Sequence, residues 1–204
     1  MRLIGRLDSP YVRRVAIAMR LMGLAFDHEP LSVFRDVEAF AAINPVIKAP
    51  TLVTDDGTAL IDSTLILMYL DSLVPADRRL QPEAADALLT VQHAVGLALA
   101  ACEKTVQIVY ETQLRPADKQ HAPWLDRVRG QAQAAYDLLE QAYRPVDDWL
   151  LPDRMTQADI TAAVAWRFTN GMLADLLAPD RYPALAALSA RAEATPVFQA
   201  LPFG

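Results

Sequence analysis

The chain has 204 residues, of which 53% are hydrophobic and 22% charged, a composition that excludes a disordered or fibrous protein and suits one medium domain or two small ones. Its formal net charge is -6, from 19 basic and 25 acidic residues without a basic run, so nucleic acid and anionic membrane surfaces are not expected as partners. Cys102 is the only cysteine, which excludes an intrachain disulfide and a thiolate zinc site. With no apolar segment long enough to span a membrane, we expect a cytoplasmic protein.

The first third of the chain predicts strands that alternate with helices. We expect a short strand at 2–7, then a helix with Ser9 as its N-cap and Pro10 at its first position, ending at Gly23. A second strand is expected at 25–33. Because a helix separates the two strands, they are predicted to be parallel.

The first helix is predicted to be amphipathic. Its apolar residues recur at the spacing of one buried face: Val12, Val15, Ala16, Met19 and Met22. By the same spacing, Arg13 and Arg14 are expected to lie largely off that face. Residues 37–43 can add one or two further helical turns.

A β-hairpin and another helix follow. Strands are expected at 51–54 and 59–61, joined by an Asp-Asp-Gly-Thr turn. Asp62 and Ser63 then open a helix that ends before Pro75. The order of elements is therefore β-α-β followed by β-β-α.

From residue 83 onward the sequence predicts helix throughout. The polar segment 75–82, bracketed by two prolines, is the best candidate for a linker. Helices are expected at 83–114, 122–143, 156–177 and 183–193. Thr156 and Asp159 have the spacing of a capping box at the start of the third of these.

Ser9 is the first candidate functional residue. As a helix N-cap its hydroxyl would contribute about 1 kcal/mol to stability, and this is the simpler interpretation. The same hydroxyl would lie beside unpaired N–H groups at the positive end of a helix dipole, where an anion is stabilised and a thiol loses its proton more readily. No base at an obvious spacing supports a nucleophilic serine triad.

Pro50 is the second candidate, because it leads into a predicted strand. From the residues alone a trans bond is favoured, since about 5–6% of X–Pro bonds in folded proteins are cis. A cis bond would direct the backbone N–H and C=O of Ala49 out of the sheet, where a bound peptide could pair with them. Lys48 by itself predicts only a solvated surface lysine.

Asp62 and Ser63 form the third candidate. They suit a helix cap, which is the structural interpretation. The alternative is that the carboxylate, the hydroxyl and the helix N–H groups hold a ligand that carries both an ammonium and a carboxylate.

In this order and spacing, three segments resemble the cytosolic glutathione transferases: S-P-Y-V-R-R-V at 9–15, N-P-V-I-K-A-P-T-L at 44–52 and L-I-D-S-T-L-I-L-M-Y-L at 60–70. The resemblance covers essentially the whole chain and is closest to bacterial members that use a serine after the first strand. It implies an α+β, thioredoxin-like N-terminal domain (βαβ-ββα) at 1–76 and an all-α helical C-terminal domain at 83–204.

The resemblance also implies roles for five residues. Ser9 matches the hydroxyl that stabilises the glutathione thiolate, and Ala49, just before a cis-proline, matches the residue whose backbone pairs with the glutathione cysteine. Lys48 would lie near the glycine carboxylate, while Asp62 and Ser63 match the acid–serine pair that holds the γ-glutamyl end. The family more often has glutamate in place of Asp62 and valine in place of Ala49, and the shorter aspartate could weaken the hold on the γ-glutamyl group.

An apolar pocket for a second substrate is implied between the two domains. Its candidate walls are Leu7, Val106, Tyr110 and Trp166, although an ordinary core position is the simpler interpretation of each. The implied activity is attack of the glutathione thiolate on a small electrophile, with glutathione as co-substrate, no metal, and a homodimer as the assembly. The alternatives are a glutathione-binding module with little chemistry and a glutathione-dependent isomerase or dehalogenase.

Overall fold

The computed structural model describes residues 1–152 and 154–204 and divides into two compact units. The first unit comprises Met1–Gln81 together with Ala194–Gly204, and the second comprises Pro82–Glu193. Each unit has its own secondary structure and its own core.

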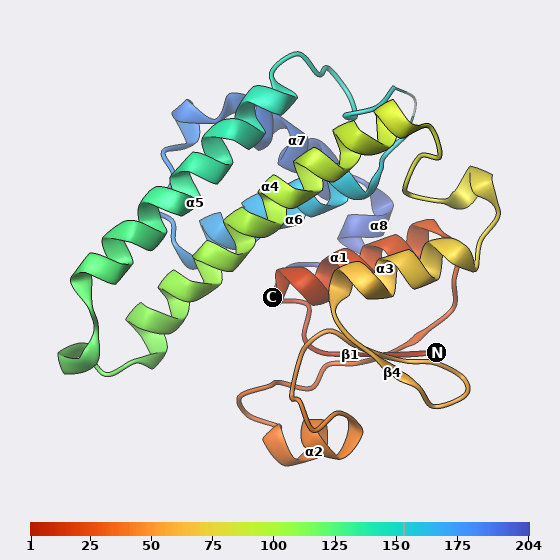
Figure 1. Ribbon diagram of the computed structural model, residues 1–204, viewed down its shortest axis with the longest axis horizontal. Coiled ribbons are helices and arrows are strands. Elements are labelled where there is room, and N and C mark those ends of the chain that lie inside the picture. Colours follow the sequence, from red (N-terminus) through yellow and green to blue (C-terminus); the bar gives the residue numbers. More distant parts are fainter. Residues whose placement is uncertain (153) are drawn as a thin grey trace. The chain divides into compact units, whose positions relative to one another are not determined.

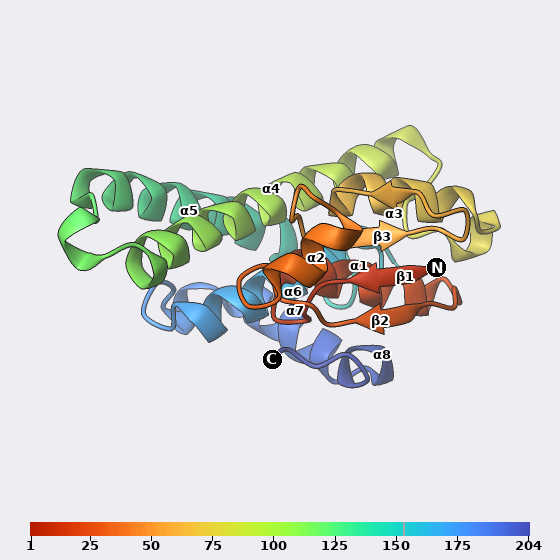
Figure 2. The ribbon, with the colours of Figure 1, turned by 90° about the horizontal axis from the view of Figure 1, so that it is seen from below.

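The first unit is built on a mixed four-stranded sheet. Its strands are β1 (Arg2–Ile4), β2 (Asp27–Glu29), β3 (Thr51–Val53) and β4 (Ala59–Leu60), in the spatial order β2-β1-β3-β4. The parallel pairing of β1 with β2 and the β3–β4 hairpin are as the sequence predicts, although each strand is shorter than expected. Figure 2 shows β1, β2 and β3 side by side, with β1 antiparallel to β3.

Helices cover both faces of this sheet. Helix α1 (Pro10–Leu21) and helix α3 (Ser63–Ser72) lie together on one face, and the short helix α2 (Val37–Ile43) lies on the other (Figure 1). A short 3-10 helix, η1 (Ala76–Arg78), interrupts the segment predicted as a linker. The short helix α8 (Pro196–Gln199), which the sequence did not predict, packs against α1.

Packing of the C-terminal tail explains an error in the predicted first helix. Arg13 and Arg14 are 0% and 1% exposed, so the expectation that they lie off the buried face is wrong. The Nε of Arg13 donates a 2.8 Å hydrogen bond to the carbonyl of Leu201, and its guanidinium stands 5.3 Å from the centre of the Phe198 ring. The tail therefore belongs with the first unit, whereas the predicted domain boundaries had assigned it to the helical part.

The second unit is entirely helical. Its elements are α4 (Ala85–Val109), the π-helical turn η2 (Tyr110–Leu114), the 3-10 turn η3 (Ala117–Lys119), α5 (Ala122–Tyr143), α6 (Gln157–Met172), the 3-10 turn η4 (Pro179–Arg181) and α7 (Pro183–Glu193). Helix α4 packs against α5 and α6, and α7 packs against the same two helices (Figure 1). The predicted helix at 83–114 thus changes to π geometry near its end, and α6 stops earlier than expected.

The interior of the second unit combines aromatic and hydroxyl side chains. Tyr136 and Thr169 are joined by a 2.5 Å hydrogen bond, and Thr169 also bonds Thr105 at 2.8 Å. The rings of Tyr136, Trp166 and Tyr182 meet edge to face, with centroids 5.7 to 6.3 Å apart. These contacts tie α4, α5, α6 and the start of α7 into one core.

Helix α4 is part of a segment that is longer and more apolar than the sequence-based expectation of no membrane-length segment. Within the helical segment Ala85–Leu114, an 18-residue window has a mean hydropathy of 1.4 and is 33% buried, so by length and composition alone this helix could cross a membrane. One such helix is weak evidence for a membrane span, since the core helix of a soluble protein passes the same test, and α4 packs against α5 and α6. Cys102 lies buried within it, as expected of a small core residue.

Candidate functional site

Ser9 lies half-buried at the start of α1. Its backbone is extended, and its Oγ accepts the N–H of Val12 at 3.4 Å, which is the N-cap geometry that the sequence predicts. A hydroxyl has one proton to donate and two lone pairs that accept. Because one lone pair takes the Val12 N–H, the Ser9 proton remains to be donated to a group outside the helix.

Gly5 connects this helix start to the rest of the first unit. Its N–H donates to the carbonyl of Glu29 at 2.9 Å, and its own carbonyl lies 2.8 Å from the Nε2 of His28. A Cβ placed on Gly5 would come 2.6 Å from a methyl group of Val12 and 3.1 Å from the Cβ of Ala49. The backbone at Gly5 is therefore in contact both with α1, which begins after Ser9, and with the segment that carries Ala49.

The loop between α2 and β3 is held from within. Asn44, which is buried, donates from Nδ2 to the Oγ1 of Thr51 at 2.8 Å, and its Oδ1 accepts the N–H of Val46 at 3.0 Å. The Thr51 hydroxyl in turn donates to the carbonyl of Lys48 at 2.7 Å. Asn44 and Thr51 were not predicted as site-supporting residues, although Asn before proline is a known turn signal.

This loop carries two of the predicted site residues. Lys48 is exposed and Ala49 is half-buried, and the peptide bond between Ala49 and Pro50 is cis. The resemblance therefore gave the right isomer, whereas the trans bond favoured by the residues alone is wrong. The side chains of Ile47 and Ala49 pack against a small core cluster formed by Ile4, Phe40 and Val53.

Asp62 and Ser63 form the start of α3. The carboxylate of Asp62 is exposed and caps the helix through Oδ1, which accepts the N–H of Thr64 at 2.9 Å and the N–H of Leu65 at 3.4 Å. The second oxygen, Oδ2, is left to face other groups. Ser63 is 3% exposed, and within the described residues its backbone N–H has no acceptor.

Arg14 links this second helix start to α1. Its Nη1 donates to the Oγ of Ser63 at 3.2 Å and to the Oγ1 of Thr64 at 3.4 Å. The spacing of apolar residues in the first helix placed Arg14 off the apolar face and so gave no sign of this role. No pattern within one helix reveals a partner that lies 49 residues further along the chain.

The four candidate pocket walls fall in different units. Leu7 is half-buried in the first unit, whereas Val106, Tyr110 and Trp166 belong to the second. Trp166 is 6% exposed and packs in the aromatic core described above. Tyr110 begins the π-helical turn and is 45% exposed, and partial burial raises the pKa of its hydroxyl.

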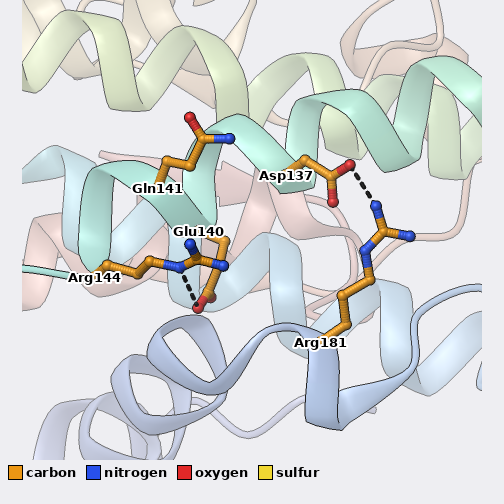
Figure 3. A pocket seen from close by; sticks show the side chains of 5 residues that line it. All are labelled: Asp137, Glu140, Gln141, Arg144 and Arg181. Atoms are coloured by element: carbon orange, nitrogen blue, oxygen red, sulfur yellow. Dashed lines mark hydrogen bonds and ion pairs between the residues drawn. The ribbon is translucent and has the colours of Figure 1, made fainter.

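A separate hollow lies on the second unit and contains none of the predicted site residues. It is about 210 Å³ in volume and is lined by Asp137, Glu140, Gln141, Arg144 and Arg181 (Figure 3). Arg181 pairs with Asp137 at 2.7 Å, and Glu140 accepts backbone N–H groups at the start of α7. Asp137 and Glu140 thus hold α5 to Arg181, Tyr182 and the first turn of α7.

The first unit thus collects polar groups at the N-termini of two helices. At α1 the group is the Ser9 hydroxyl, and at α3 the groups are the Asp62 carboxylate and the Ser63 hydroxyl and N–H. Helix N-termini favour negative charge, so both positions can accept an anionic ligand group, and the Asp62 carboxylate can pair with a cation. Within residues 1–152 and 154–204, no cluster of three or more His, Cys, Asp or Glu side chains could hold a metal ion.

Known proteins resemble this chain over nearly its whole length. Residues 3–78 match the family described as "Glutathione S-transferase, N-terminal domain", and residues 122–191 match "Glutathione S-transferase, C-terminal domain". The GST-like protein YibF of Escherichia coli K12, itself uncharacterised, is 30% identical over 83% of this chain and 82% of its own. Maleylacetoacetate isomerase of Pseudomonas aeruginosa is 28% identical over 72% of this chain and 71% of its own.

A solved structure agrees with these sequence matches. The glutathione S-transferase of Methylobacterium radiotolerans JCM 2831, crystallised in complex with glutathione sulfonate, superposes with a TM-score of 0.90. It is 30% identical, and the match covers 100% of this chain and 95% of that one.

Proposed function

This chain belongs to the glutathione S-transferase family, with a thioredoxin-like N-terminal domain and a helical C-terminal domain, and we propose that it binds glutathione in the first unit and delivers the glutathione thiolate to a small, largely apolar electrophile. The observation that carries this proposal is the geometry of Ser9. Its Oγ accepts from the Val12 N–H, so its proton is available to a sulfur anion at the start of α1.

The proposed reaction begins with loss of the glutathione thiol proton to solvent. A free thiol has a pKa near 8.5, and a hydrogen bond from Ser9 together with the α1 dipole lowers it, so more thiolate is present at neutral pH. The sulfur lone pair then forms a bond to the electrophilic carbon. Either a leaving group departs with its electron pair, or, in addition to a double bond, the displaced π electron pair takes up a proton from water.

Three further contacts fix the rest of the tripeptide in this proposal. The backbone N–H and C=O of Ala49 pair with the glutathione cysteine, and the ammonium of the exposed Lys48 lies near the glycine carboxylate. The carboxylate of Asp62 pairs with the γ-glutamyl ammonium through Oδ2, and the N–H and hydroxyl of Ser63 bind its carboxylate. Positioning of both reactants supplies the remainder of the rate enhancement.

The second substrate and the assembly are also part of the proposal. Leu7 in the first unit and Val106, Tyr110 and Trp166 in the second are each proposed as contacts of an apolar second substrate. Members of the family are typically cytoplasmic homodimers, and we propose the same for this chain.

The resemblance to maleylacetoacetate isomerase favours a second candidate. In a glutathione-dependent isomerisation the thiolate adds to the substrate and is then released, so glutathione is not consumed. A binding module without turnover is the remaining alternative. Thiol titration during turnover separates these functions, because conjugation consumes one thiol per product, isomerisation consumes none, and a binding module forms no product.

Two substitutions of Ser9 test the thiolate role. A hydrogen bond to a charged group contributes about 1.5–3 kcal/mol, so Ser9→Ala is expected to lower kcat/KM for conjugation about 10- to 100-fold and to raise the pKa of bound glutathione, with little change in its Kd. The thiolate is measured by its ultraviolet absorbance and the Kd by calorimetry. Ser9→Asp keeps the helix cap but places a negative charge beside the sulfur. If Ser9 is only a cap, this variant keeps wild-type activity and the proposal fails.

A further inference from the structure

Arg13 and Arg14 are consecutive in α1, and both are buried to 1% exposure or less. A guanidinium remains charged in a protein, and burying it is costly unless it is hydrogen-bonded. The two neighbours meet different partners. Arg13 holds the C-terminal tail through the Leu201 carbonyl and the Phe198 ring, which is a structural role. Arg14 instead reaches the start of α3.

At the start of α3, Arg14 contacts two hydroxyl oxygens. Nη1 lies 3.2 Å from the Oγ of Ser63 and 3.4 Å from the Oγ1 of Thr64. Arginine can only donate, so each hydroxyl uses a lone pair for this contact and keeps its proton for another acceptor. The Ser63 hydroxyl is thereby set as a donor, in the same way that the Val12 N–H sets the hydroxyl of Ser9.

The other groups at this helix start complete a recognisable pattern. The N–H groups of Thr64 and Leu65 are taken by Asp62, whereas the N–H of Ser63 meets no acceptor among the described residues. Ser63 therefore offers two donors, its N–H and its hydroxyl, beside an exposed carboxylate oxygen of Asp62. Two donors next to one acceptor match the carboxylate and ammonium of an α-amino acid.

We propose that Arg14 is a positioning residue for the γ-glutamyl α-carboxylate of glutathione, acting from inside the fold through the hydroxyl of Ser63. This inference rests on the proposed function. With 1% exposure, Arg14 does not itself touch the ligand. It directs the Ser63 proton outward, and its permanent positive charge strengthens that hydroxyl as a donor to an anion at the N-terminus of α3.

The test measures discrimination between glutathione and an analogue in which only the γ-glutamyl α-carboxylate is converted to a carboxamide. Calorimetry gives both dissociation constants, and their ratio reports the carboxylate alone. We expect wild type to prefer glutathione at least tenfold, and Arg14→Gln to reduce that preference to about twofold, because charge-assisted hydrogen bonds are about twice as strong as neutral ones. Arg14→Lys keeps the positive charge but lacks the planar guanidinium group. Its preference for glutathione is expected to lie between those of wild type and Arg14→Gln.

Two controls separate this role from a general loss of structure. Ser63→Ala is expected to lower the preference as Arg14→Gln does, and the double variant is expected to lose no more than either single one. Arg13→Lys changes the adjacent buried arginine and is expected to lower the melting temperature while keeping the wild-type preference. At saturating glutathione, kcat with a dinitrophenyl halide is expected to stay within twofold of wild type in the Arg14 variants, because the sulfur lies at Ser9.

The outcomes distinguish the two proposals. If wild type binds no glutathione, the proposed function itself fails. If wild type binds and discriminates but Arg14→Gln discriminates equally well, the role of Arg14 is overturned. Should Arg14→Gln not fold, the Arg14→Lys variant decides. A preference for glutathione in Arg14→Lys within a factor of 1.5 of the wild-type preference overturns the inference. Full additivity of the Arg14 and Ser63→Ala effects on that preference overturns it as well.

Discussion

Gly5 lies so close to Val12 that a Cβ atom at position 5 would come 2.6 Å from the Val12 Cγ2 atom. The φ angle of Gly5 is +130°, a region that residues with a side chain rarely adopt. Gly5→Ala is therefore expected to destabilise the protein by about 2–4 kcal/mol through strain and overpacking. The backbone N–H of Val12 donates to the Oγ of Ser9, so a shift of Val12 also displaces the Ser9 hydroxyl. Gly5→Ala is therefore expected to weaken glutathione binding as well. Denaturant unfolding and calorimetry measure the two effects.

Gly57 provides the matched control for this prediction. It also has a positive φ, +88°, but a Cβ there would meet nothing within 4 Å. Gly57→Ala is expected to cost only the backbone term of about 1 kcal/mol and to leave the Kd for glutathione unchanged. Equal losses of stability in the two variants would show that the contact with Val12 is unimportant.

The features that the sequence predicted are those decided by local chemistry. Ser9 caps α1 and Asp62 caps α3, because a side-chain oxygen needs only the next two or three N–H groups to do so. The hairpin follows equally from its Asp-Gly turn. The capping box of Thr156 and Asp159 is likewise confirmed.

The features that the sequence missed depend on distant partners. Arg13 is buried by the tail at 194–204, and Arg14 by the start of α3, so neither could be placed by the periodicity of α1. The cis bond after Ala49 was available only from the family resemblance. Gly5 carried a usable signal, since a lone glycine between a strand and a helix cap often marks close backbone approach.

The exposed face of α3 predicts self-association. Leu65 and Met68 are each 56% exposed, Tyr69 on the same helix is 36% exposed, and Leu73 at its C-cap is 45% exposed. Clustered apolar side chains on a surface favour an interface. We expect light scattering to give the mass of a homodimer, and Met68→Glu to weaken the dimer at least tenfold. Leu138→Glu changes an isolated exposed leucine of α5 and is expected to leave the mass unchanged. A wild-type mass of one chain would contradict the prediction.

Glu140 fastens α5 to α7. Its Oε1 and Oε2 accept the N–H groups of Ala184 and Leu185 at 3.1 and 3.0 Å, which are donors in the first turn of α7. Glu140→Gln replaces one acceptor with a donor and removes the charge that favours a helix N-terminus, so a loss of about 2–3 kcal/mol is expected. Arg144→Ala removes a partner of Glu140 that is 65% exposed, and is expected to cost less than about 0.5 kcal/mol. Thermal unfolding of the two variants compares these contributions directly.

Asp159 holds the segment before α6 with four hydrogen bonds. Oδ1 accepts from the N–H of Leu150 and the hydroxyl of Tyr143, and Oδ2 accepts from the N–H and hydroxyl of Thr156. Asparagine at position 159 keeps one acceptor oxygen, but its NH₂ group would face two hydrogen-bond donors. Asp159→Asn is therefore expected to destabilise the protein by about 2–3 kcal/mol near neutral pH.

The loss of stability caused by Asp159→Asn is expected to depend on pH, because Asp159 titrates and asparagine does not. Burial raises the pKa of this carboxyl above its usual value near 3.8, and the hydrogen bonds only partly oppose it. The folded state therefore binds this proton more tightly than the unfolded state, and the contribution of Asp159 to stability falls as pH rises from about 3.8 through the raised pKa. The difference in unfolding free energy between wild type and Asp159→Asn is expected to be largest at acid pH, to decline across that window, and then to remain level. A difference that instead grows as pH rises through the window would mean that the hydrogen bonds outweigh burial and that the folded-state pKa is lowered.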